Sequence, residues 1–332
     1  MQASIEQKRL SGPLITFGVL LLLMAATRIA AANILIPGSW LEAARVLITV
    51  IFVGLPVVAI FYGAKFDWTP ARAGIFLGVS VVAWGALFVV AATIAKRNMD
   101  FNGVVTTLMD VDMFFFCLGL GALIASSLKD KNLIVPISIF LILFDVFLVL
   151  TPEGPTRQLI VHMPTVLAAI GHGIPEVGSI PKHGHVVFFA SVGPADFLFL
   201  SMFFVALSRF QMRAAATLGV LLPILLAYLL LTRWLSAVPL LVPIGIAVLA
   251  VNLRDFKLTR QEWLGTGLVA LLGVGLITWS ATRPDEKAPP PPIWVELDAQ
   301  GLPKSAGSPA QVDPSRPRSA SPLGAKSKPS PP

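Results

Sequence analysis

The fold is decided by an apolar stretch at residues 133–150, which reads LIVPISIFLILFDVFLVL and contains one charged residue, Asp145. A helix of this length rises about 27 Å at ~1.5 Å per residue, close to the ~30 Å hydrocarbon core of a bilayer. We therefore expect an all-α fold, a polytopic membrane helix bundle of about nine transmembrane helices. The expected spans are residues 13–32, 46–62, 73–95, 113–128, 133–150, 186–207, 214–231, 237–251 and 263–281.

The composition supports a membrane protein. Of the 332 residues, 55% are hydrophobic and only 13% are charged, about half the charged fraction of a soluble domain. The net charge of +7 comes from basic clusters between apolar runs, as in loops beside anionic headgroups. No basic stripe interleaved with aromatic residues indicates a nucleic-acid partner. The loop-poor, Ala- and Leu-rich build predicts a multi-pass protein of a bacterial cytoplasmic (inner) membrane.

The same pattern divides the chain into consecutive segments. We expect a polar N-terminal segment, four transmembrane helices, a membrane core, one more loop and helix, and a disordered tail rich in Pro and Ser. Within the core, a Gly- and Pro-rich connection at residues 151–185 separates the fifth and sixth spans. The segments are residues 1–12, 13–132, 133–251, 252–282 and 283–332.

Two carboxylates lie well inside the apolar runs, Asp145 in the fifth and Asp196 in the sixth. Intramembrane acids are costly and are functional candidates by default. Because consecutive spans are antiparallel, the two side chains can lie at one depth and meet. Two adjoining carboxylates share a proton, so one can activate water while the other protonates a carbonyl oxygen. Asp110 and Asp112 lie at the mouth of the fourth run, where we expect them to cap its helix.

Three motifs carry a resemblance to a known family. Residues 144–157 read FDVFLVLTPEGPTR, residues 193–199 read GPADFLF, and residues 237–243 read AVPLLVP. In order and spacing they resemble the two catalytic motifs and the Pro-Ala-Leu motif of presenilins and signal peptide peptidases, which are intramembrane aspartyl proteases. The resemblance implies a presenilin-like core and covers about a third of the chain. In this sequence Phe144 replaces a Tyr of the family pattern, Ala195 a Gly and Leu240 an Ala.

The resemblance also implies roles for individual residues. It makes Asp145 and Asp196 the catalytic pair and implies no cofactor and no metal. Single-span transmembrane proteins or peptides would be the substrates, with Phe144 and Arg157 supporting the site. The implied substrate-binding residues are Gly193, Pro194, Ala195, Pro239, Leu240 and Leu241. Physically, Gly193 and Pro194 are expected to open the helix before the second acid, and Pro239 to keep its segment out of regular helix.

Other functions stay open. A proton-coupled transporter could use the same two acids, and an inactive pseudoprotease could bind transmembrane helices without cleaving them. The four histidines, His162, His172, His183 and His185, share the 151–185 connection, where ordinary loop positions are favoured over a metal site. No membrane-buried histidine is expected to activate Ser191 or Ser201, which argues against a serine mechanism. The single Cys117 is expected to be a packing residue.

Overall fold

A computed structural model describes residues 2–31, 38–93, 99–151, 154–162, 171–175, 188–229 and 238–282. The described chain is mostly helical, and each of the nine expected apolar runs contains a helix. Among the described residues, six helices are long and apolar enough to cross a membrane, which is consistent with a multi-pass membrane protein. Helices are suited to lipid because a helix satisfies its backbone hydrogen bonds internally, where lipid offers no partner. The expected tail at 283–332 lies outside the described residues.

The first half of the chain forms four long helices. The first and the fourth of these helices begin earlier in the sequence than expected. The segment at 1–12 is not separate, because helix α1 already includes it from Gln2 onward. The fourth helix begins at Met99 and not near residue 113, so it is one of the longest helices and not a short one. The helices are α1 (Gln2–Ala31), α2 (Leu41–Gly63), α3 (Pro70–Thr93) and α4 (Met99–Ser127).

The second half contains shorter helices and a small sheet. The expected span at 186–207 is wrong at its start, since Phe188–Val192 is a β-strand and the helix begins only at Pro194. Strands β1 and β2 pair antiparallel, with His172 opposite Val192. The elements are α5 (Ile134–Leu150), α6 (Pro155–His162), β1 (His172–Pro175), β2 (Phe188–Val192), α8 (Pro194–Arg209), α9 (Ala214–Leu229), α10 (Leu241–Asn252) and α11 (Arg260–Ala281).

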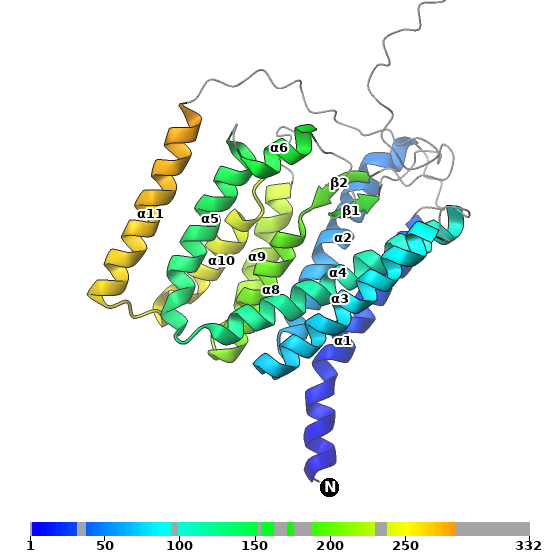
Figure 1. Ribbon diagram of the computed structural model, residues 1–332, viewed down its shortest axis with the longest axis horizontal. Coiled ribbons are helices and arrows are strands. Elements are labelled where there is room, and N and C mark those ends of the chain that lie inside the picture. The colour runs from blue at the N-terminus through cyan, green and yellow to red at the C-terminus, as the bar shows by residue number, and fades with distance from the viewer. Residues whose placement is uncertain are drawn as a thin grey trace, which may run out of the picture.

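The helices form a continuous bundle with α8 and α9 at its centre (Figure 1). Helix α8 packs against α4 and α2, and α9 packs against α2 and α10. Helix α10 continues the packing to α5, which in turn contacts α11. The β1–β2 hairpin lies at the end of the bundle where α5 ends and α8 begins (Figure 1). Helices α3 and α11 bury the smallest share of their apolar residues, so most of their surface is left for lipid.

Helix α8 is held to α4 by a close approach of their backbones. A Cβ atom at Gly121 would lie 2.8 Å from the Leu198 carbonyl oxygen, so only glycine fits there. Beside it, the Ser201 hydroxyl donates to Cys117 O at 2.6 Å. The Cys117 thiol, itself buried as expected, donates to Pro194 O at 3.3 Å. These contacts fix the first turns of α8 against α4.

A buried asparagine, Asn252, ties α9 to α10. Asn252 Oδ1 accepts from Arg213 N–H at 3.0 Å, and Asn252 Nδ2 donates to Thr217 Oγ1 and Val248 O, each at 2.9 Å. This cluster joins the beginning of α9 to the end of α10. Each of these polar atoms would be costly to bury without a partner.

Candidate active site

Asp145 lies five residues before the last residue of α5, Leu150. Its side chain is only 6% exposed. Oδ2 accepts a hydrogen bond of 2.8 Å from the backbone N–H of Leu241, the first residue of α10. The segment around Pro239 therefore contacts the first acid directly. The Leu241 N–H is available for this bond because the first N–H groups of a helix have no partner within the helix.

Asp196 is the third residue of α8, in its first turn. Gly193 is the N-cap, and its backbone N–H donates to Asp196 Oδ2 at 3.2 Å. Pro194 occupies the first helical position, where its missing N–H costs nothing. The expectation that Gly193 and Pro194 open an existing helix is therefore wrong, because they begin one. The second acid is held at a helix N-terminus and not in the middle of a span.

The two acids lie beside consecutive residues at the start of α10, since Asp145 bonds Leu241 and Asp196 lines a cavity with Leu240. Asp145 and Asp196 lie close enough to interact electrostatically, and α10 packs against both α5 and α8. The first turn of a third helix thus packs against both helices that carry the acids, and a direct contact between the two carboxylates stays a prediction. Asp145 also interacts electrostatically with Tyr228 of α9, a residue that the sequence did not single out.

A small cavity adjoins the second acid. Its volume of about 10 Å³ corresponds to roughly one water molecule. Of the described residues that line it, Asp196 is the only polar one, and Leu240 is among the apolar ones. The other lining residues come from α2, β2, α8, α9 and α10: Val53, Val57, Val192, Phe197, Leu200, Leu225 and Ile244.

The Pro239 segment follows the expectation in part. Pro239 precedes the helix, Leu240 is its N-cap, and Pro243 lies in its first turn. Leu240 and Leu241 are both buried, one against the cavity and the other beside Asp145. The Leu241 amide is already paired with an acid, so it is not free for an incoming peptide strand.

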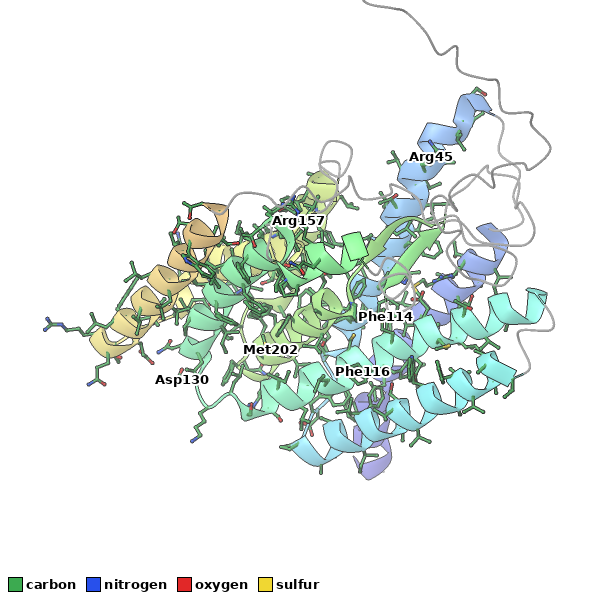
Figure 2. The ribbon with its side chains drawn as sticks, turned by 45° about the horizontal axis from the view of Figure 1, so that its top comes forward. Arg45, Phe114, Phe116, Asp130, Arg157 and Met202 are labelled. Carbon is green, nitrogen blue, oxygen red and sulfur yellow. The ribbon has the colours of Figure 1, made fainter. Side chains whose placement is uncertain are left out.

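The remaining predicted residues lie around this centre and not in it. Ala195 is exposed, so its methyl group does not crowd the site. Phe144 is 37% exposed and stacks on Phe140, with ring centroids 5.2 Å apart. Arg157 of α6, labelled in Figure 2, donates to Leu150 O at 3.3 Å and so binds the C-terminal end of α5. The supporting role expected for Arg157 and Phe144 stays a prediction.

A second polar centre was missed. Asp110 does not cap a helix but is buried in the middle of α4, where its Oδ2 accepts from Arg28 of α1 and lies 2.7 Å from His172 Nδ1, within hydrogen-bonding distance. Asp112 bonds to the Ser80 hydroxyl of α3 at 3.1 Å. His172 is fully buried, so treating all four histidines as loop residues was wrong for this one. His183 and His185 lie outside the described residues.

Two aspects of the sequence signal explain this omission. The partners Asp110 and His172 are 62 positions apart in the chain. In addition, the helix that contains Asp110 was expected to begin near residue 113, later than it does. An Arg inside the first apolar run, Arg28, and an Asp just before the fourth, Asp110, would have been the useful signal, because intramembrane charges pair with each other. The buried histidine does not serve a serine, since its two nitrogens bond Asp110 and Phe52 O.

Comparisons with protein-family models, with curated proteins and with solved structures found no match to the chain. Within the described ranges, no group of three or more His, Cys, Asp or Glu side chains is arranged to hold a metal ion. What the site defines is a multi-pass helical membrane protein in which a buried acid, Asp145, and a half-buried acid, Asp196, lie beside the start of α10. Their hydrogen bonds come from the backbones of Leu241 and Gly193.

Proposed function

We propose that the protein is an intramembrane aspartyl protease, similar to presenilins and signal peptide peptidases, that hydrolyses peptide bonds within single-span transmembrane substrates. The observation that supports the proposal is that Asp145 and Asp196, on two different helices, lie beside the consecutive residues Leu241 and Leu240 and next to a small cavity. Carboxylate pairs of this kind are general acid–base catalysts of amide hydrolysis. The nine-span topology, the presenilin-like core and the bacterial inner membrane belong to the same proposal.

In the proposed mechanism the two acids share one proton. The ionised carboxylate takes a proton from a water molecule in the cavity, and the protonated one donates to the oxygen of the scissile carbonyl. The hydroxide adds to the carbonyl carbon to give a gem-diol, which collapses when the amine leaves with a proton. The Leu241 and Gly193 amides each hold one carboxylate oxygen in place.

The same geometry indicates how a substrate must enter. The cavity accommodates about one water molecule, which is enough for the nucleophile but not for a peptide. Leu240 separates the cavity from the segment that bonds Asp145. We therefore place the scissile bond where Leu240 now packs, after the start of α10 has moved outward.

The test is cleavage of a synthetic transmembrane peptide by the purified full chain in detergent or liposomes. Asp145→Asn and Asp196→Asn each keep a side-chain oxygen that can accept the Leu241 or Gly193 amide, so both variants should fold and melt like the wild type. Each should lose cleavage by at least about 10³-fold, the scale for losing an essential acid–base group. An inhibitor that mimics the tetrahedral intermediate should block the wild type.

A matched control is Asp67→Asn, which removes an exposed carboxylate in the loop before α3. This carboxylate pairs with Arg72 in the first turn of α3. It should cleave at the wild-type rate. Cleavage that survives in both active-site variants would refute the proposal. Capture of the peptide by the wild type without any fragments would instead identify a pseudoprotease.

A proton-coupled transporter is the second candidate. The observation in its favour is the additional buried group of Arg28, Asp110 and His172, because chains of intramembrane ionisable residues mark proton relays. Against it, the rings of Phe114 and Phe197 contact His172, and among the described residues the cavity is lined by apolar side chains apart from Asp196. Proton-driven solute flux in liposomes, lost in Asp196→Asn, would favour transport.

A further inference from the structure

The buried group of Arg28, Asp110 and His172, hereafter the charge cluster, joins four elements. Arg28 comes from α1, Asp110 from α4 and His172 from β1, and His172 Nε2 donates to Phe52 O of α2 at 3.0 Å. Arg28 is 6%, Asp110 8% and His172 0% exposed. A buried ion pair costs desolvation energy, so its retention calls for a role beyond stability alone.

The hydrogen bonds fix the number of protons in the charge cluster. Nε2 of His172 faces a carbonyl oxygen, which only accepts, so this nitrogen carries hydrogen. Nδ1 faces a carboxylate at 2.7 Å, and that contact also requires a proton, on either partner. Together with the guanidinium of Arg28, the cluster therefore holds a net charge of +1. The aromatic rings of Phe52, Phe114 and Phe197 surround the imidazole, a favourable setting for a cation.

The charge cluster is connected to the second acid by two short routes. Along the sheet, His172 pairs with Val192, which directly precedes the N-cap Gly193 whose amide holds Asp196. Through the side chains, the imidazole contacts the ring of Phe197, with centroids 5.8 Å apart. Phe114 of α4, labelled beside the hairpin in Figure 2, packs on both rings.

We infer that His172 is a positioning residue, which the charge cluster anchors so that the β1–β2 hairpin fixes the first turn of α8 and the location of Asp196. The hairpin has few other attachments among the described elements, since β1 packs on β2 and α2. Among the described residues, Asp110 from α4 bonds the imidazole directly, and Arg28 from α1 is joined to it through Asp110. The catalytic consequence rests on the proposed function, whereas the anchoring does not.

The anchoring is tested by thiol labelling of the full chain, which requires no activity. In a Cys117→Ser background, which retains a donor to Pro194 O, Val192→Cys places a buried reporter opposite His172. A permeant maleimide should label this thiol slowly. Loss of a charged buried hydrogen bond in Asp110→Asn or His172→Gln should raise the labelling rate by roughly 10- to 100-fold. Arg28→Lys, which keeps the charge, should stay near the parent rate.

A second reporter separates local from global loosening. Val248→Cys is buried in α10 beside Asn252. It should not respond to His172→Gln, but it should respond to Asn252→Ala, which in turn should leave Val192→Cys unchanged. If Asp110→Asn does not fold, His172→Gln carries the test, because it retains an amide donor. Equal labelling of Val192→Cys with and without the charge cluster would overturn the inference.

Activity then gives an independent result. If the wild type cleaves a transmembrane peptide, His172→Gln should lower kcat about tenfold or more with little change in KM, because Asp196 moves while the Leu240 segment does not. A rise in KM at unchanged kcat would contradict the positioning role. If the wild type does not cleave at all, the proposed function fails, yet the labelling experiment still decides whether the charge cluster anchors the hairpin.

Discussion

A methyl group added at Gly121 tests whether α4 fixes the position of the second acid. The new Cβ would lie 2.8 Å from Leu198 O and from Met202 N, and closer still to the Ser201 hydroxyl. Backbone atoms cannot move aside as a flexible side chain would, so α8 must shift away from α4. Overpacking of this kind costs about 1–3 kcal/mol. Gly121→Ala also gains up to ~1 kcal/mol of helix propensity, which must be cancelled by a control.

The matched control is Gly78→Ala in α3, where no atom lies within 4 Å of the added Cβ. Because both substitutions gain the same propensity, the difference between them isolates the contact with α8. We expect the free energy of unfolding, measured by detergent titration, to be about 1–3 kcal/mol lower for Gly121→Ala than for Gly78→Ala. Cleavage should fall in the first variant and not in the second. Equal stability of the two variants would refute the close packing of α4 on α8.

Three further predictions concern α5 and its surroundings. Phe144→Tyr should leave the cleavage rate within about twofold, because Phe144 stacks on Phe140 and is partly exposed; a large gain in kcat would contradict this placement. Tyr228→Phe should lower kcat several-fold at unchanged stability if its hydroxyl acts on Asp145, and an unaltered kcat would remove that role. Gly154→Ala should lower the melting temperature, because its Cβ would meet Phe147 O at 2.6 Å; an unchanged melting temperature would count against this turn.

The sequence predicted the helices well because lipid leaves an apolar run few alternatives. The run at 133–150 became α5 within one residue of the expected start. Asp145 and Asp196 were found for the same reason, since an acid inside such a run stands out by its cost. Their mutual approach was expected from antiparallel spans. In the structure both acids lie beside the start of α10, and their direct contact stays a prediction.

The hairpin and the charge cluster could not be predicted in the same way. The strand Phe188–Val192 is apolar and directly continues into α8, and a short apolar run does not distinguish a strand from a buried helix. The start of α4 was placed too late because polar residues such as Asn102 and Asp110 resemble a loop. Recognising Asp110 as buried would have required its partner Arg28, which is 82 positions away.

The smallness of the cavity beside Asp196 has a kinetic consequence. In such a protease the helices must separate before the peptide bond is hydrolysed. The turnover rate would therefore depend on how readily the surrounding lipid allows that movement. Thicker or stiffer bilayers would slow the enzyme without altering its chemistry, and the solvent isotope effect would shrink accordingly.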